Sequence, residues 1–201
     1  MQYPQKPAET DLPLIDPIRV RWSPRAIGDR KVEQKKIDTL FEAARWAPSS
    51  SNLQPWHYLY ATKDDGAYRE RLESLLTEGN AWAKHAYILA IGFAKKTMQR
   101  SIGIVPNPYY MHDTGAASFA MALQAPSLGL IVHQMGGFNK DQANEVLGVP
   151  EEYAPTSMIA IGYPGELSQL NEKHLAQEKE PRTRRPQSAF VFHNIWPENQ
   201  A

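Results

Sequence analysis

Residues 47–56 read A-P-S-S-S-N-L-Q-P-W, a run of hydroxyl and amide side chains enclosed by prolines. Pro48 must end the helix that precedes it, and Pro55 favours an extended backbone at Gln54. Because the segment is also too polar for a buried strand, we expect an ordered loop between a helix and a strand. Two interpretations are open: a simple capped connection, or a rigid shelf whose hydroxyl, amide and backbone N–H groups bind a planar polar ligand.

Apolar residues on both sides of this loop follow helical or strand spacing. Ile37, Leu40, Phe41 and Ala44 show the i, i+3, i+4, i+7 pattern of a helix that begins at Glu33. Further helices are expected at 68–76 with Gly79 as C-cap, at 113–123 with Pro126 as the end, and from Asn139 to Gly148. Strands are expected at 56–61, 87–94, 128–135, 156–163 and 189–192. Strands that alternate with helices predict an α/β or α+β sandwich.

The bulk composition is that of an ordinary soluble protein. The chain has 201 residues, which suits a single domain over 1–201. Its 22 basic and 22 acidic residues balance, so no net field attracts nucleic acid or a membrane. There is no cysteine, which excludes disulfides and thiolate chemistry. No signal-like or membrane-spanning apolar run occurs, so we expect a cytoplasmic location.

Three segments should lie outside the regular elements. Residues 1–17 are rich in proline and predict an extended N-terminal arm. Residues 95–110 show no clean period and contain Pro106 and Pro108, so we expect a loop that can serve as a short lid. Residues 181–201 form a C-terminal arm.

Two arginine motifs are candidates for an anion site. In Arg21-Trp22-Ser23-Pro24-Arg25 an extended backbone places both arginines and the serine on one side. In Pro181-Arg182-Thr183-Arg184-Arg185-Pro186 an extended backbone places Arg182 and Arg184 on one side in the same way. Guanidinium groups match phosphate oxygens, although solvated surface arginines explain each motif alone.

Three polar or small-residue positions each allow two interpretations. Asn80 is either a helix cap, which the sequence favours, or a ligand contact. Gly136-Gly137 is either a plain turn or a place where a ligand approaches the backbone closely. The small residues of 113–123 suit either a buried central helix or a helix at a dimer interface.

The sequence contains no motif for a metal site, a hydrolase nucleophile or a nucleotide-binding loop. The six histidines show no i, i+4 pair for a zinc site, so no metal is expected. G-x-S-x-G, G-x-G-x-x-G and the P-loop pattern are all missing from the sequence. We therefore expect no catalytic side chain, and any redox reaction must depend on a bound cofactor.

Taken in order, the motifs resemble the FMN-dependent nitroreductase family of NAD(P)H-using flavoproteins. The similar segments are R-x-S-x-R at 21–25, A-P-S-S-S-N-L-Q-P-W at 47–56, N-A-W-A at 80–83, D-T-G-A-A-S-F at 113–119, S-L-G-L at 127–130 and R-T-R-R-P at 182–186. The resemblance implies an α+β sandwich with a mainly antiparallel central sheet flanked by helices. It also implies a homodimer that exchanges C-terminal arms and binds two FMN molecules at the subunit interface.

The resemblance also assigns roles to individual residues. The phosphate and nearby ribityl oxygens are expected to be bound by Arg21, Ser23, Arg182 and Arg184. Trp22 is expected to pack or hydrogen-bond at the same place. Arg25 lies near the pyrimidine edge, where its charge supports the reduced ring, and Asn80 faces the same ring. Gly136 and Gly137 approach the central edge of the isoalloxazine. The partner chain supplies Pro48, Ser49, Ser50 and Asn52.

The implied activity is a ping-pong hydride transfer. NADH or NADPH reduces the flavin and leaves, and a nitro compound, quinone or activated carbonyl takes its place. Two departures concern the substrate side: Gly136 stands where many members have Glu, and 95–110 is short beside the helical excursion of larger members. Gly136 is expected to weaken the placement of the nicotinamide or the substrate, and the short segment 95–110 predicts a more open substrate site.

Two other functions compete with this one. A flavin-binding sensor or storage protein would bind the cofactor with little turnover. A nucleic-acid module built on Arg182–Arg185 is disfavoured by the balanced charge and by the lack of stacking aromatics near that run.

Overall fold

The computed structural model describes residues 3–194 and 196. Its α-helices are α1 (Asp16–Val20), α2 (Gln34–Arg45), α3 (Ala67–Ser74), α4 (Tyr110–Gln124), α5 (Lys140–Leu147) and α6 (Glu172–Lys179). Its strands are β1 (Trp56–Thr62), β2 (Ile88–Lys95), β3 (Thr97–Arg100), β4 (Gly103–Pro106), β5 (Ile131–Met135) and β6 (Tyr153–Gly162).

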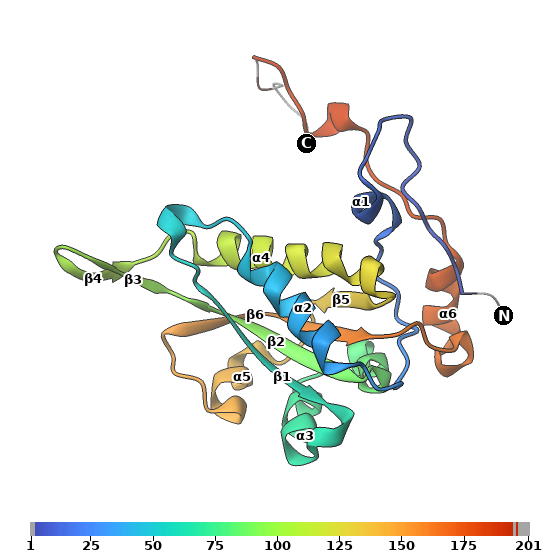
Figure 1. Cartoon of the computed structure of the whole chain (residues 1–201), viewed down its shortest axis with the longest axis horizontal. Helices are drawn as coiled ribbons and strands as arrows, with labels where there is room; N and C mark the ends of the chain where they lie inside the picture. Colours follow the sequence, from blue (N-terminus) through green and yellow to red (C-terminus); the bar gives the residue numbers. More distant parts are fainter. Residues whose placement is uncertain (1–2, 195, 197–201) are drawn as a thin grey trace.

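The central sheet has four strands in the order β1-β2-β6-β5, and every neighbouring pair is antiparallel. Helices α2 and α4 cover one face, and α3 and α5 cover the other (Figure 1). Strand β2 is buried along nearly its whole length because both faces are covered. The predicted α+β class with a mainly antiparallel sheet is confirmed.

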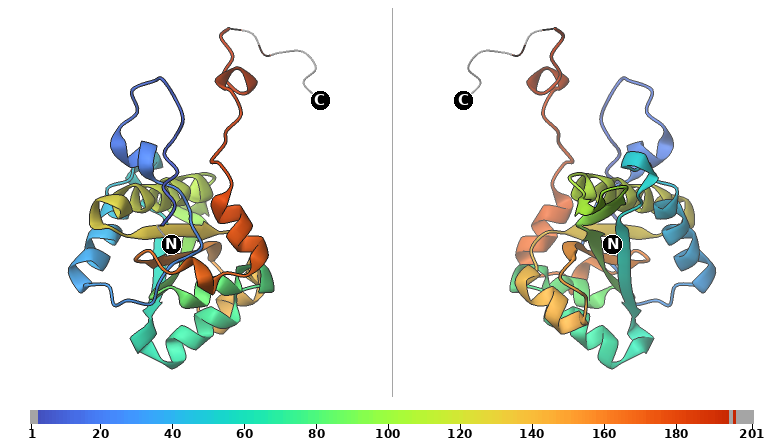
Figure 2. Two further views of the ribbon diagram at one scale, coloured as in Figure 1. Left: turned by 90° about the vertical axis from the view of Figure 1, so that its right-hand side faces the viewer. Right: turned by 90° about the vertical axis from the view of Figure 1, so that its left-hand side faces the viewer.

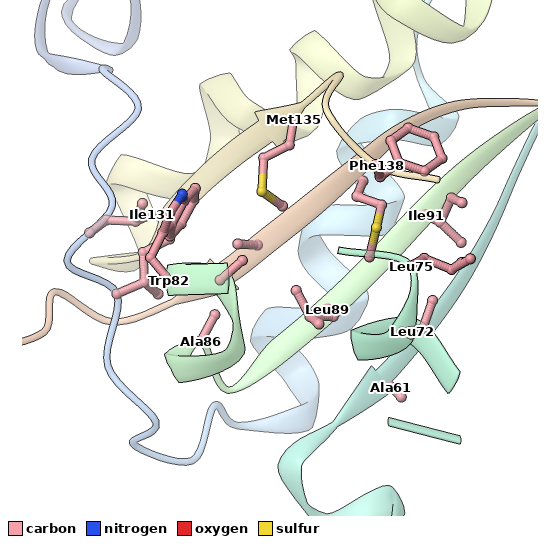
Figure 3. Close-up of a cluster of buried hydrophobic side chains, with 14 of the residues drawn as sticks. Ala61, Leu72, Leu75, Trp82, Ala86, Leu89, Ile91, Ile131, Met135 and Phe138 are labelled. Carbon is pink, nitrogen blue, oxygen red and sulfur yellow. The ribbon is translucent and has the colours of Figure 1, made fainter. Parts of the chain in front are cut away.

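Successive side chains of β2 serve two different cores. Ile88 and Ala90 pack with Leu40 of α2 and Met121 of α4. Leu89 and Ile91 point the other way and join a cluster with Leu72, Trp82, Met135 and Phe138 (Figure 3). Met135 and Phe138 are buried on either side of Gly136-Gly137, so the core fixes the position of this glycine pair.

Strand β6 runs between two regions of the molecule, and its length shows how far apart they are. At one end, the backbone N–H of Lys95 donates to Pro55 O (2.9 Å), and Lys95 pairs with Tyr153, the first residue of β6. At the other end, Pro164 follows β6 and bridges to Ile27. The ten residues of β6 span about 33 Å. The residues next to the serine-rich loop and those next to Arg25 therefore lie at opposite ends of the sheet.

Most of the predicted elements near the loop are present. Helix α2 occupies 34–45, β1 begins at Trp56, and α4 ends before Pro126 as expected. Helix α5 begins after Asn139 and is followed by the C-cap Gly148, whose φ of 68° suits glycine. Strand β5 begins later than predicted, at Ile131, because Ala125–Leu128 forms a turn of 3-10 helix.

Segment 95–110 corrects one prediction. Instead of a loop it contains a hairpin, in which Thr97 of β3 pairs with Pro106 of β4. Proline is accommodated there because it stands at the end of an edge strand, where no ladder donor is needed. The hairpin extends from the body at the end that carries the serine-rich loop (Figure 1).

Three local predictions are also wrong. Helix α3 ends at Ser74 rather than near Gly79, which lies inside the 3-10 segment Glu78–His85. Residues 189–192 form no strand, because the segment leaves the body beyond a 3-10 turn at Gln187–Ala189 and meets no sheet edge (Figure 2). Gln54 is not extended but has φ of 47°, since its backbone N–H turns inward to Ser49 Oγ.

The two arms lie on the same side of the molecule. Residues 3–15 carry no regular element, as predicted for that part of the 1–17 arm, and lead into α1. The N-terminal loop and the C-terminal segment both rise on the α4 side of the body (Figure 2). Residues 1–2, 195 and 197–201 of the two predicted arms lie outside the described residues.

Candidate functional site

One cleft, here called the arginine cleft, gathers both arginine motifs. It encloses about 210 Å³ and is lined by Lys6, Arg21, Trp22, Ser23, Arg25, Gln177, Glu178, Arg182 and Arg184. Six of these residues were predicted as site residues from the sequence. Lys6, Gln177 and Glu178 were missed, because a lone lysine in the arm and two residues of a polar helix carry no local signal.

Three chain segments build the arginine cleft. Arg21 Nη1 donates to Ser23 Oγ (3.2 Å). Arg182 Nη1 donates to the carbonyl of Arg19 (3.1 Å), which ties the C-terminal segment to the end of α1, next to Arg21. The ammonium of Lys6 lies 4.6 Å from the Trp22 ring centroid. The residues that line one cavity are therefore far apart in the sequence.

Like charges crowd in this cleft. Burial lowers the pKa of Arg21, and the nearby Arg182 and Arg184 lower it further. Burial and Arg184 also lower the pKa of Arg182. Guanidinium groups that repel each other are stabilised when an anion enters between them. The donor set, with a serine hydroxyl among the arginines, suits a phosphate.

A second cluster surrounds the glycine pair. Asn80 Nδ2 and Thr77 Oγ1 donate to Gly137 O at 2.7 and 2.9 Å. A Cβ on Gly137 would lie 2.9 Å from Asn80 Nδ2, whereas a Cβ on Gly136 would meet no atom within 4 Å. A side chain at Gly137 would therefore displace the Asn80 amide, whereas Gly136 borders open space. The cap interpretation of Asn80 is wrong, because the side chain holds the glycine pair instead.

His133 of β5 connects the two clusters. Its Nδ1 lies 2.9 Å from Pro24 O and must carry the hydrogen, since a carbonyl only accepts. Burial, with the charges of Arg25 and Arg21, lowers the pKa of His133 to about 4, so the ring is neutral at pH 7. Gly136 is three residues further along the chain. The contact of His133 with Pro24 therefore connects the segment Arg21–Arg25 to the strand that leads to the glycine pair.

The serine-rich loop, Ser49–Gln54, has an unusual backbone. Ser51, Asn52 and Gln54 have φ of 51°, 53° and 47°. Such values cost free energy in residues other than glycine, and they persist where surrounding contacts fix them. Here Gln54 N–H donates to Ser49 Oγ (3.0 Å), and Gln54 Nε2 donates to Asn52 Oδ1 (3.1 Å).

The contact that anchors this loop was missed in the sequence. Asp113, buried at the start of α4, accepts from Ser50 N–H through Oδ2 (3.0 Å). The signal was present, because Asp113 begins the D-T-G-A-A-S-F motif. Its partner could not be predicted, since 63 residues separate the two.

The serine-rich loop does not reach the arginine cleft of its own chain. None of the residues predicted there, Pro48, Ser49, Ser50 and Asn52, lines the cleft. Helix α2, with 12 residues and a length of about 18 Å, and β6 both separate the two regions. The loop and α6 lie toward opposite ends of the long axis of the molecule (Figure 1).

The described residues also bear on whether the chain has a metal site or a membrane-spanning helix. Within residues 3–194 and 196, no three side chains of the metal-ligating types gather as a set of ligands. No helix in the same ranges combines the length and the apolar character needed to cross a bilayer.

The fold and the cleft define an α+β protein with a cleft lined mainly by basic side chains at one end of an antiparallel sheet. The model of the Nitroreductase family matches residues 18–163. The chain therefore belongs to the Nitroreductase family, and it is an oxidoreductase.

Three similar proteins agree with this assignment. A Streptomyces coelicolor protein with the provisional name NADH dehydrogenase/NAD(P)H nitroreductase is 36% identical over 181 residues, which cover 80% of this chain and 86% of that protein. A solved structure described as an oxidoreductase containing FMN is 34% identical, with a TM-score of 0.88, and covers 95% of this chain and 96% of that one. A nitroreductase family protein from Clostridium difficile 630 is 26% identical, with a TM-score of 0.67, and covers 88% of this chain and 95% of that one.

Proposed function

We propose that this chain is an NAD(P)H-dependent FMN oxidoreductase that acts as a homodimer. One observation carries the proposal: the contact of Pro24 with His133 connects the phosphate-type cleft to the strand that leads to the open glycine pair, while the serine-rich loop lies at the other end of the sheet. The cleft and the glycine pair fit the two ends of one mononucleotide. The serine-rich loop fits a site on a second chain. The whole of 1–201 is proposed to act as one domain, and its cytoplasmic location stays a prediction.

The arginine cleft fits the phosphate end of FMN. Arg21, Arg182 and Arg184 supply planar donors that pair bidentately with phosphate oxygens, and Ser23 adds a hydroxyl. Trp22 forms an apolar wall. Occupation by a phosphate relieves the repulsion that lowers the pKa values of Arg21 and Arg182.

The glycine pair fits the ring end. Gly136 borders open space, so a flat ring can approach the backbone there. Asn80 lies beside it and is held by Gly137 O. Arg25 follows Pro24, whose carbonyl binds His133, and so lies between the cleft and the glycine pair. Bound FMN would supply the ring that accepts a hydride and returns it.

The geometry of α4 supports a two-fold dimer. Asp113, near its first residue, binds the serine-rich loop, and Ala122 and Ala125, at its far end, share a cavity with Arg21 and Trp22. A two-fold axis near the middle of α4 exchanges these ends, so each chain's loop meets the partner's arginine cleft. Met111 and Phe119 of α4 are 45% and 46% exposed, which leaves apolar area for a partner.

The homodimer also gives the exposed arms a role. Ile15 and Val20, at the two ends of α1, and Phe190 and Val191 of the C-terminal arm are exposed, and the segments that carry them rise on the α4 side (Figure 2). A partner chain on this side would cover them, and the C-terminal arms would be exchanged. FMN at the interface would then contact both chains.

The electron donor and the substrates are proposed from the named relatives. Their names include NAD(P)H nitroreductase and NADH dehydrogenase. Because the chain has no dinucleotide-binding fingerprint, NADH or NADPH and the oxidised substrate would use one site in turn. Nitro compounds, quinones and activated carbonyls are the proposed substrates, and the small β3–β4 hairpin leaves room for them.

The test is the visible spectrum of the purified protein, followed by anaerobic addition of NADH or NADPH. We expect a yellow dimer with one FMN per chain, whose colour bleaches rapidly and returns with a nitroaromatic or a quinone. A stable yellow protein that neither nucleotide bleaches would favour a flavin sensor or storage protein. A colourless monomer that takes up no added FMN would contradict the proposal.

A further inference from the structure

Helix α6 brings an acid into the arginine cleft. Glu178 is fully buried and is the only carboxylate that lines the cleft among the described residues. The other titratable side chains that line the cleft are cationic, namely Lys6, Arg21, Arg25, Arg182 and Arg184. A carboxylate is out of place in a site for a phosphate, because it repels the ligand. Its presence there requires a separate explanation.

Glu178 acts on one arginine in particular. Its Oε1 accepts from the backbone N–H of Arg25 (3.1 Å) and lies 3.6 Å from Arg25 Nη1. Its Oε2 is buried without a hydrogen-bond partner. The carboxylate thus holds both the main chain and the guanidinium of Arg25, and part of its own charge stays uncompensated.

Structural support alone does not account for this acid. Replacing a buried ion pair by apolar groups is often neutral or stabilising, so such a pair gives weak evidence for a role in stability. The orphan oxygen makes the arrangement still less favourable. A buried negative charge behind an arginine does, however, reduce the positive potential that the arginine presents on its other side.

We propose that Glu178 is a positioning residue that sets the reduction potential of the bound flavin through Arg25. This inference rests on the proposed function. The carboxylate fixes Arg25 toward the ring and offsets part of its charge. Negative charge on the reduced ring is then stabilised less than by a free arginine. The consequence is a lower potential and a stronger reductant.

The main test is Glu178→Gln, measured by equilibration of the FMN-loaded dimer with a reference dye of known potential. Glutamine keeps an acceptor for Arg25 N–H but removes the charge. We expect reduced FMN to bind about tenfold more tightly relative to oxidised FMN, a rise of about 30 mV for a two-electron couple. Glu172→Gln, an exposed acid on the same helix, should leave the potential unchanged.

A double-mutant cycle shows whether the effect passes through Arg25. Arg25→Ala should lower the potential, opposite to Glu178→Gln. In the Arg25→Ala background, Glu178→Gln should then cause almost no shift. An equal shift in both backgrounds would overturn the positioning role and leave only a direct field on the flavin.

The pH dependence gives a readout that a purely structural residue would not move. Burial raises the pKa of Glu178, and Arg25 and Lys6 oppose that rise. Tyr3 also faces this acid, and His174 and His133 face Arg25. Above its pKa the Glu178 carboxylate is charged, so the wild-type and Glu178→Gln potentials should differ. They should converge as the pH falls and Glu178 takes up a proton.

The outcomes separate this inference from the proposed function. If wild-type protein binds no FMN, the proposed function fails. If wild type binds FMN and is bleached by NAD(P)H but Glu178→Gln has the wild-type potential, the inference alone fails. If Glu178→Gln does not fold, Glu178→Asp keeps the charge and withdraws it from Arg25. A smaller rise in potential supports the inference, and no rise overturns it.

Discussion

The arginine cleft and the serine-rich loop were both predicted to hold the same cofactor, yet the structure builds them in different ways. The arginine cleft is complete within one chain and is closed by segments from both termini. The serine-rich loop is fixed in a strained backbone by Asp113 and by its own side chains, but it faces no cleft residue of its own chain. One region is a cleft closed within its own chain, and we propose that the other contributes to a site on a partner chain.

This difference supports the proposal that two chains are needed to complete each FMN site. A loop that must fit a ligand on another molecule cannot adjust through its own fold, so its shape has to be fixed beforehand. The backbone strain at Ser51, Asn52 and Gln54 is consistent with such a role. The arginine cleft can instead adjust through long side chains on two arms.

The largest expected effect comes from breaking the cleft. Arg21→Ala removes a partly buried guanidinium that is proposed to donate hydrogen bonds to the phosphate. It should weaken FMN binding about a hundredfold, the usual range for a charge-assisted pair. Riboflavin, which has no phosphate, should bind as tightly as it does to wild type. Fluorescence titration of the apoprotein measures both. Arg19→Ala, an exposed neighbour outside the cleft, is the matched control; equal losses for both flavins would place the phosphate elsewhere.

The next largest effect should come from disturbing the packing of Ile27 and Gly28, which follow the segment Arg21–Arg25. A Cβ on Gly162 would lie 2.7 Å from Ile27 Cγ2 and 2.8 Å from Gly28 O. Gly162→Ala should therefore lower the free energy of unfolding by about 2 kcal/mol, as overpacking usually does. Urea unfolding of the apoprotein measures this. A Cβ on Gly79 meets nothing within 4 Å, so Gly79→Ala should not destabilise the protein.

A smaller loss should follow from releasing the serine-rich loop. Asp113→Ala removes the acceptor of Ser50 N–H and frees the strained backbone. We expect FMN and riboflavin to bind about tenfold more weakly, and equally so, because the loop is proposed to hold the ring rather than the phosphate. His112→Ala removes the exposed partner of Asp113 and should change little. A loss confined to FMN would contradict the assignment of the loop to the ring.

The smallest effect concerns His133, which joins the cleft to the glycine pair. Burial lowers its pKa from 6.5 to about 4, so below pH 6.5 the unfolded chain takes up a proton that the folded chain does not. Stability should fall by about 1 kcal/mol from pH 6.5 to 5.5 through this residue. His133→Gln should lose that part of the pH dependence in urea titrations. An identical slope in the variant would show that His133 is not the group involved.

The sequence predicted those features that depend on neighbouring residues. The period of Ile37, Leu40 and Ala44 identified α2, and the uniform apolarity of 87–94 identified a strand covered on both faces. The arginine motifs were identified because each places its side chains on one side of a short extended segment. The family resemblance then connected motifs that no local pattern joins.

The features that were missed depend on distant contacts. Pro106 suggested a loop, but a proline at the end of an edge strand is compatible with the β3–β4 hairpin. Asn80 suggested a cap until its partner was known to be Gly137. Glu178 belongs to a polar helix, and only the tertiary fold places it beside Arg25, 153 residues away.

The most direct test of the central claim, that the cleft of one chain binds FMN together with the loop of the other, is complementation. Arg21→Ala damages the cleft, and Ser49→Ala with Asn52→Ala damages the loop, so each variant alone should bind FMN poorly. Mixed dimers of the two variants should regain one tight FMN site per dimer, because one of the two sites then combines an intact cleft with an intact loop. If each site lay within one chain, every site in the mixed dimer would keep a defect, and no tight binding would return.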